Sequence, residues 1–316
     1  MENEHHREIE LIIEREFGER VASIERMTSG ICNEVYRVST GDMDRIVRLK
    51  DQARYMYGSH NHIPIFRAAG INVPEILAAD YSKSHSPFAY QVMSVIPGRD
   101  ISDVIDTLSD EELKQIAAHI SRVFDALRDV PNNGKFGVLW GDGEDLVDSW
   151  TAAVERETNI AKKRGTRTGV LDARLTELLE WINREYKPYF ESVKPVTYYG
   201  DICAKNVMIY EGKFSGLVDL DALAQGDPLE AIGRIKASWY GTHHGCVYTD
   251  AVMDAQRLDA DQRRIVTMYA LLNRIFWTME NGIQFNQNTT FRIDRILEKQ
   301  DKAIVEALYA ELRFTL

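Results

Sequence analysis

Residues 198–221 constrain the fold of this chain more strongly than any other segment, because they interrupt a long helical pattern. Two short runs, at 207–210 and 214–218, have the composition of β-strands, and a tight connection that contains a glycine joins them. Pairing these runs as a hairpin brings its open ends together. Asn206, just before the first strand, and Asp219, just after the second, are therefore expected to converge on one point.

An amide oxygen and a carboxylate at one point suit Mg²⁺, which takes few protein ligands and completes its shell with water and phosphate oxygens. Asp201 lies earlier on the same loop, where it could reach a hydroxyl group beside that metal. Two carboxylates and an amide clustered in this way fit phosphoryl transfer, in which positioning and charge neutralisation supply most of the catalysis. The segment therefore predicts a site for metal-assisted phosphoryl transfer.

The part of the chain before residue 94 is rich in predicted strands. Apolar residues at helical spacing predict a first helix over 4–17. Strand-like composition and alternation then predict strands at 35–39, 45–50, 74–77 and 88–93, with one helix near 63–69.

Long amphipathic stretches replace the strands beyond Pro97-Gly98. They predict helices over 108–127, 146–162, 171–186, 262–279 and 293–312. Ser109, followed by Glu112, has the spacing of a capping box. We therefore predict an α+β fold in two lobes, a small antiparallel-sheet lobe over 1–93 and a large, mainly helical lobe over 94–316.

Asp201, four intervening residues and Asn206, followed by a hairpin and Asp219, resemble the catalytic loop and metal-binding aspartate of the protein-kinase superfamily. The longer pattern, from Tyr-Gly-Asp through Gly-Leu-Val-Asp-Leu-Asp to Gly-Asp-Pro, more closely resembles the aminoglycoside phosphotransferase and choline kinase-like family. The resemblance implies a protein-kinase-like fold in which Asp201 is the catalytic base and Asn206 and Asp219 bind Mg²⁺. It also implies that Asp221 helps to position the metal or its water shell. Two interpretations of Lys205 stay open, a cation that offsets charge on the transferred phosphoryl group and a solvated loop lysine.

Nucleotide-binding residues follow from the same resemblance. Residues 28–38 resemble the family's first hairpin, whose loop covers the ATP phosphates and here includes Ser29 and Gly30. The hinge of the family, where backbone groups receive the adenine, corresponds to about Gln91 to Met93.

Arg48 lies where the family has a basic residue that contacts phosphate, and the fork of an arginine suits phosphate oxygens. Lys50 shares the same strand face, so spacing does not separate the two. The family often pairs this basic residue with a glutamate from a helix of the small lobe, but residues 58–62 hold none. Either the helix is shifted, or the ion pair is absent or replaced. His60 and His62, in the same stretch, are interpreted as solvated histidines.

The charge balance limits the classes of partner. Lys plus Arg number 38 against 49 Asp plus Glu, so the formal charge is 38 − 49 = −11. Nucleic-acid binding needs excess positive charge, so a nucleic-acid partner is not expected. An acidic surface is compatible with a cationic acceptor, although solubility alone accounts for it more simply. The acidic loop at 142–148 carries the same two interpretations.

We therefore expect a phosphotransferase that uses ATP or GTP with Mg²⁺ to phosphorylate a hydroxyl group of a small molecule, first of all an aminoglycoside-like amino sugar or amino alcohol. A metabolic kinase of the same fold, acting on choline, homoserine or a sugar, is the alternative, together with a non-catalytic nucleotide-binding pseudokinase. The polar first residues, the lack of a long apolar run and three scattered cysteines lead us to expect a cytoplasmic protein without a membrane partner.

Overall fold

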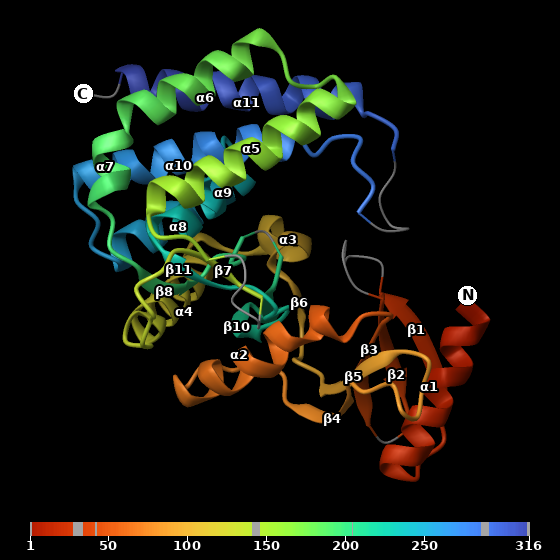
Figure 1. Cartoon of the computed structure of the whole chain (residues 1–316). Helices are drawn as coiled ribbons and strands as arrows, with labels where there is room; N and C mark the ends of the chain where they lie inside the picture. Colours follow the sequence, from red (N-terminus) through yellow and green to blue (C-terminus); the bar gives the residue numbers. More distant parts are fainter. Residues whose placement is uncertain are drawn as a thin grey trace.

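The computed structural model describes residues 2–27, 34–41, 43–140, 146–203, 205–285 and 291–314. Within these ranges the chain forms a smaller lobe that contains a sheet and a larger, mainly helical lobe (Figure 1). This arrangement confirms the predicted α+β fold in two lobes. Ser29, Gly30 and residues 142–145 of the acidic loop lie outside the described residues.

An antiparallel sheet forms the centre of the small lobe. Its strands are β1 (Ser23–Met27), β2 (Glu34–Ser39), β3 (Asp44–Lys50), β4 (Ile76–Asp80) and β5 (Ala89–Ser94), in the order β1-β2-β3-β5-β4. Side chains alternate across each strand, so Val47 and Leu49 face one side of the sheet while Ile46 and Arg48 face the other.

Helix α1 (Glu2–Phe17) covers the first of these faces (Figure 1). Ile9, Ile12 and Ile13 recur at helical spacing and are buried in one cluster with Val47 and Leu49. Burying each isoleucine contributes about 1.5–3 kcal/mol. The predicted first helix is thus confirmed, and the opposite face of the sheet is left for the contacts that build the site.

That opposite face contacts η1 (Ala53–Met56) and α2 (Tyr57–Ala68), which lie at the boundary between the lobes (Figure 1). Helix α2 begins earlier than the predicted range 63–69 and includes Pro64. Its buried residues include Gly58, Ser59 and His62. The first two are small, which lets the backbone of α2 approach the large lobe closely.

The large lobe is built mostly of helices, which Figure 1 shows stacked on one another. They are α3 (Ile101–Val104), η2 (Ile105–Thr107), α4 (Asp110–Arg128), α5 (Trp150–Thr168), α6 (Ala173–Glu185), α7 (Lys187–Ser192), α8 (Leu229–Ser238), α9 (His243–Ala255), α10 (Ala260–Thr278) and α11 (Arg295–Phe314). The five long helices predicted from amphipathic spacing are α4, α5, α6, α10 and α11. The predicted capping box of α4 is present, with Ser109 Oγ accepting from the amide of Glu112 at 3.3 Å. Helix α9 was not predicted.

Two small sheets complete the fold. The first contains β6 (Arg99–Asp100), β9 (Val207–Tyr210) and β10 (Lys213–Leu217), and the second contains β7 (Gly137–Leu139), β8 (Val196–Tyr199) and β11 (Leu223–Gly226). The pairing of β9 with β10 confirms the predicted hairpin, although an irregularity between Phe214 and Gly216 shifts its register. The second sheet was not predicted, because its short strands pair with partners that are distant in sequence and not across a tight turn.

The hairpin is attached to the small lobe through Asn72. The carbonyl oxygen of Asn72 accepts from the amide of Leu217 at 3.0 Å, and its Nδ2 donates to the carbonyl of Ser215 at 2.5 Å. A side chain at Gly216 would crowd the same carbonyl of Asn72. None of the helices in the described ranges has the length and apolarity that crossing a bilayer needs.

Candidate active site

The loop between β8 and β9 carries the predicted catalytic residue. Asp201 Oδ2 accepts a hydrogen bond from Asn206 Nδ2 at 2.8 Å, and the carbonyl of Asp201 accepts from the same nitrogen at 3.1 Å. Burial raises the pKa of Asp201, while the positive charge of Arg234 and the bond from Asn206 oppose that rise. The amide of Asn206 therefore fixes the orientation of the Asp201 carboxylate.

Asn206 is held by three separate contacts. Besides the bonds to Asp201, its backbone N–H donates to Asp100 Oδ1 at 2.9 Å and its carbonyl accepts from Val218 N at 3.0 Å. Its φ of 74° lies in the left-handed region, which asparagine adopts more readily than most residues. Among the described residues, none donates a hydrogen bond to Asn206 Oδ1, so this amide oxygen is available to a cation.

Asp219 directly follows Val218, whose N–H donates to the carbonyl of Asn206 and so joins the two ends of the hairpin. Its φ of 57° is also left-handed, and its carbonyl accepts from Tyr199 Oη at 2.9 Å. The same hydroxyl contacts the Val218 carbonyl at 3.0 Å. Asp219 has an exposed surface, but the protein atoms around its carboxyl group limit the hydration of that group. This desolvation and the negative charge of Asp221 raise the pKa of Asp219. The structure thus brings Asp201, Asn206 and Asp219 together.

The donor set formed by Asn206 Oδ1 and the Asp219 carboxylate fits Mg²⁺. Both are hard oxygen ligands, and Mg²⁺ usually takes one or two carboxylates and fills its shell with water and phosphate oxygens. Across the described ranges, no three His, Cys, Asp or Glu side chains gather as a metal site. The ligand roles of Asn206 and Asp219 stay predictions that this geometry supports.

Arg48 is enclosed, with 4% of its side chain exposed. Its Nη1 donates to Ser59 Oγ at 3.0 Å, to Gln91 Oε1 at 3.3 Å and to Asp221 Oδ1 at 3.2 Å. Its Nη2 forms an ion pair with Asp221 Oδ2. The ion pair that the sequence lacked on α2 is therefore replaced by one to Asp221, which lies just after Asp219.

This pairing gives Asp221 contacts that the sequence did not predict. Both of its carboxylate oxygens accept from Arg48, and Oδ1 also accepts from the amide of Ser59 at 3.2 Å. Asp221 also interacts with the carboxyl group of Asp219. The role beside the metal that the resemblance implied stays a prediction. Lys205 is exposed on its loop near Asp100. Burial raises the pKa of the Asp100 carboxyl, and the positive charge of Lys205 opposes that rise. Both interpretations of Lys205 stay open.

Gln91 and Met93 lie on β5, which pairs with β3 on one side and with β4 on the other. The Gln91 side chain is buried, accepts from Arg48 and donates to Tyr81 Oη at 2.9 Å. Met93 belongs to the apolar core. Because β5 is an inner strand, its backbone groups pair within the sheet, and the first backbone groups beyond it are those of Val95 and Ile96. The adenine contact expected at about Gln91 to Met93 stays a prediction.

Several further residues of the site were not identified from the sequence. His62, which was interpreted as solvated, is 3% exposed, and this expectation was wrong. Its Nδ1 donates to the carbonyl of Leu220 at 2.9 Å, and burial lowers its pKa. Ser59, Asp100 and Tyr199 hold Arg48, Asn206 and Asp219, respectively. No local pattern signals such contacts, because each joins segments that are distant in sequence.

Charged residues of the large lobe interact electrostatically with Asp201. Arg234 Nε donates to Glu230 Oε1 at 2.6 Å, and Arg164 Nη1 donates to Glu280 Oε1 at 2.6 Å. Burial raises the pKa of Glu280, and the charges of Arg234 and Asp201 also act on it. These two ion pairs, from α5, α8 and the turn that follows α10, place acidic and basic groups near the predicted base.

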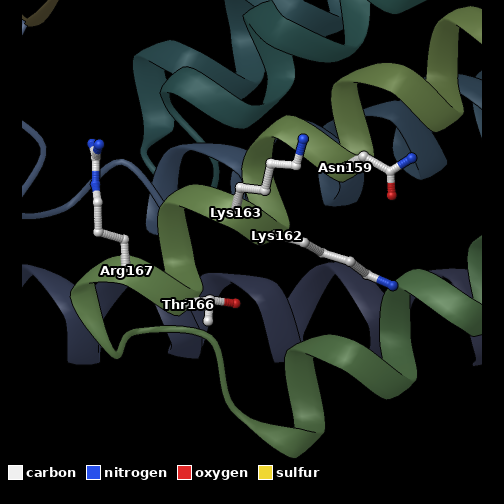
Figure 2. A pocket seen from close by; sticks show the side chains of 5 residues that line it. All are labelled: Asn159, Lys162, Lys163, Thr166 and Arg167. Carbon is white, nitrogen blue, oxygen red and sulfur yellow. The ribbon is translucent and has the colours of Figure 1, made fainter.

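A surface hollow lies on α5. It has a volume of about 560 Å³ and is lined by Asn159, Lys162, Lys163, Thr166 and Arg167. Figure 2 shows these side chains spread along the helix rather than converging on one point. A second hollow of about 420 Å³ lies beside β6 and the turn of the β9–β10 hairpin. Neither contains Asp201, Asn206 or Asp219.

Comparison with known proteins gives a family match over most of the chain. Residues 23–265 match the model of the phosphotransferase enzyme family. No curated protein sequence matches the chain.

Solved structures with similar folds cover nearly the whole chain. A thermostable mutant of aminoglycoside phosphotransferase APH(4)-Ia, in a ternary complex with AMP-PNP and hygromycin B, is 15% identical with a TM-score of 0.70, covering 95% of this chain and 97% of that chain. The GDP complex of wild-type aminoglycoside 2'-phosphotransferase-IIIa is 14% identical with a TM-score of 0.69, covering 98% and 99%. The GDP and kanamycin complex of APH(2")-IIia is 15% identical with a TM-score of 0.69, covering 98% and 97%. At these identities the likeness shows the fold.

Proposed function

Because the chain belongs to the phosphotransferase enzyme family, as its sequence predicted, we propose that it transfers the γ-phosphate of ATP or GTP to a hydroxyl group of a small molecule. The observation that carries this proposal is the convergence of Asp201, Asn206 and Asp219, in which Asn206 donates through Nδ2 to the base and leaves Oδ1 for a metal. We assign nucleotide binding to residues 1–93 and the catalytic loop, metal site and acceptor site to residues 94–316.

Asp201 is proposed as the general base. Its carboxylate is held by Asn206 and is free to accept the proton of the acceptor hydroxyl as the new bond to phosphorus forms. Mg²⁺, bound by Asn206 and Asp219, would neutralise charge on the nucleotide phosphates. Arg48 would bind phosphate oxygens, and the backbone groups of Val95 and Ile96 would meet the nucleotide base.

The acceptor is proposed to be an aminoglycoside-like amino sugar or amino alcohol. Glu230 and Glu280 lie near Asp201, and a cationic amino group can pair with carboxylates of this kind. Neighbours in fold have been solved with hygromycin B and with kanamycin, which supports this class of acceptor. Cys203 and Cys246 are not joined in a disulfide, which is compatible with the cytoplasm, where we propose that the protein acts.

Release of ADP or GDP tests the proposal. The full chain is incubated with Mg²⁺ and ATP or GTP across a panel of aminoglycosides, amino alcohols, choline, homoserine and sugars. Acceptor-dependent release with amino sugars or amino alcohols is expected. Release with only choline, homoserine or a sugar would overturn the acceptor class, while nucleotide binding without release for any acceptor would favour the pseudokinase alternative.

A further inference from the structure

The carboxylate that holds Arg48 comes from the large lobe and not from α2. Asp221 Oδ1 and Oδ2 accept from Nη1 and Nη2 of Arg48, so one carboxylate meets the end of the guanidinium through two bonds. Paired bonds of this kind fix the plane of the guanidinium as well as its position. The residues of α2 that reach the same place are small or neutral, and Ser59 Oγ accepts from Nη1 at 3.0 Å.

Helix α2 is shaped to admit this arrangement. A Cβ atom at Gly58 would collide with the backbone carbonyl of Asp221, so only glycine allows the helix to lie so close. The amide of Ser59 donates to Asp221 Oδ1 at 3.2 Å, and His62 Nδ1 donates to the carbonyl of Leu220 at 2.9 Å. The helix therefore supports the segment that presents the carboxylate to Arg48.

The guanidinium keeps donors for a second anion. A guanidinium has five N–H groups, and Asp221 occupies the edge formed by Nη1 and Nη2. Within the described part of the chain, no acceptor is bonded to Nε of Arg48, and Nη2 is bonded to Asp221 alone. The edge formed by Nε–H and the second Nη2–H can thus bind a phosphate oxygen while Asp221 stays in place.

We propose that Asp221 is the positioning residue for Arg48, holding the guanidinium so that its Nε edge receives the nucleotide phosphate. This inference rests on the proposed function, in which Arg48 contacts the phosphates. Because Asp221 follows the predicted metal ligand Asp219, the same short segment sets both the metal site and the phosphate-binding arginine. The α2 helix contributes the steric fit and not the charge.

The test measures nucleotide affinity without any acceptor, so that it does not depend on phosphoryl transfer. Dissociation constants for ATP and GTP are measured by calorimetry for the full chain and for Asp221→Asn, with Mg²⁺ and with a chelator. We expect affinity for the preferred nucleotide to fall about tenfold, which corresponds to about 1.4 kcal/mol, in both conditions. Unchanged or tighter binding would overturn the proposal, since Asp221 would then be dispensable or would compete with phosphate. A loss seen only with Mg²⁺ would also overturn it, because it would assign Asp221 to the metal.

A matched control separates positioning from general loss of stability. Asp301 lies on α11, is 7% exposed and forms an ion pair with Arg274 of α10 at 2.6 Å. Among the described residues, this pair has no hydrogen bond to any site residue named above. Asp301→Asn removes a buried Asp–Arg pair of the same kind and is expected to leave nucleotide affinity unchanged. An equal loss of affinity in Asp301→Asn would show that the effect of Asp221→Asn is nonspecific.

Two combined variants test the route through Arg48. In an Arg48→Gln background, Asp221→Asn should cause no further loss of nucleotide affinity, because the residue that it positions is gone. Exchanging the two groups, as Asp221→Ser with Ser59→Asp, returns a carboxylate to Arg48 from α2 and should recover most of the affinity lost in Asp221→Ser. Additive losses in the first experiment, or no recovery in the second together with a folded protein, would contradict the inference. The proposed transfer reaction can fail in the acceptor panel without affecting these affinities.

Discussion

The Tyr199 hydroxyl donates to the carbonyl oxygen of Asp219 across 2.9 Å, which connects the end of β8 to the segment that carries the predicted metal ligand. Tyr199 is fully buried, so this hydrogen bond is shielded from water. The strand that leads into the Asp201 loop therefore also supports the left-handed backbone of Asp219. One hydroxyl joins the two halves of the candidate active site.

Tyr199→Phe should lower both stability and Mg²⁺-dependent nucleotide binding. Removing the hydroxyl leaves the Val218 and Asp219 carbonyls without this donor, and we expect the free energy of unfolding to fall by about 1–2 kcal/mol. Urea unfolding and nucleotide titrations at several Mg²⁺ concentrations measure the two effects. Tyr248→Phe is the control, because the Tyr248 hydroxyl is buried without a hydrogen-bond partner among the described residues. Similar losses in both variants would refute the assigned role of Tyr199.

Asp201→Asn should abolish transfer and spare nucleotide binding. A general base contributes roughly 10²–10⁴ in rate, and the asparagine keeps the shape of the side chain without its basicity. Single-turnover transfer and nucleotide affinity are measured side by side. Asp254→Asn, which removes a carboxylate from an exposed ion pair with Arg263, serves as the control and should retain full activity. Activity within tenfold of the parent protein in Asp201→Asn would contradict the mechanism.

Gly58→Ala should destabilise the contact between the two lobes. Alanine in place of glycine normally stabilises a helix by about 1 kcal/mol, but here the added Cβ collides with the Asp221 carbonyl. Because backbone must move, we expect a net loss of about 1–3 kcal/mol in unfolding free energy and weaker nucleotide binding. Gly165→Ala on α5 is the comparison, since the nearest atoms that its new Cβ would meet are side-chain atoms of Met279 and Leu171, and none of these is backbone. A stabilised Gly58→Ala protein would show that the close approach is not required.

Asp80 should make the stability of the small lobe depend on pH in acid. Ser82 donates to its carboxylate through N–H at 2.8 Å and through Oγ at 2.6 Å, and the Ser82 hydroxyl bond is the largest cause of a pKa lowered to about 2 from an ordinary 3.8. A carboxyl whose pKa is lower in the folded state stabilises that state above its unfolded pKa and loses this contribution as pH falls.

The comparison is between the parent protein and Asp80→Asn over a series of pH values. The difference in unfolding free energy should be constant above about pH 5 and should shrink as pH falls from about 4 towards 2. Urea unfolding at each pH supplies the values. A difference that does not change across this range would contradict the assigned shift. The Asp80–Ser82 turn matters for the site because Tyr81, which follows Asp80, accepts a hydrogen bond from Gln91, and Gln91 accepts one from Arg48.

The amphipathic helices and the catalytic hairpin could be predicted because their signals are local. Apolar spacing in α4, α5, α6, α10 and α11 and the pair of short strands around a glycine turn need only neighbouring residues to be recognised. Helix α9 was missed because it shows no long apolar stripe, and it is buried by packing against α4 and α8. The strands of β7, β8 and β11 were missed because their partners are distant in sequence.

The sequence by itself determined the family, the two-lobed fold and the segment in which an aspartate, an asparagine and a second aspartate converge. It showed that α2 lacks a glutamate for Arg48, but not what takes its place. Asp221 is 173 residues from Arg48, and the buried His62 is 158 residues from the carbonyl that it contacts. Such pairs arise only when the lobes pack, because the partner of a buried charge is set by which segments meet in space and not by local spacing.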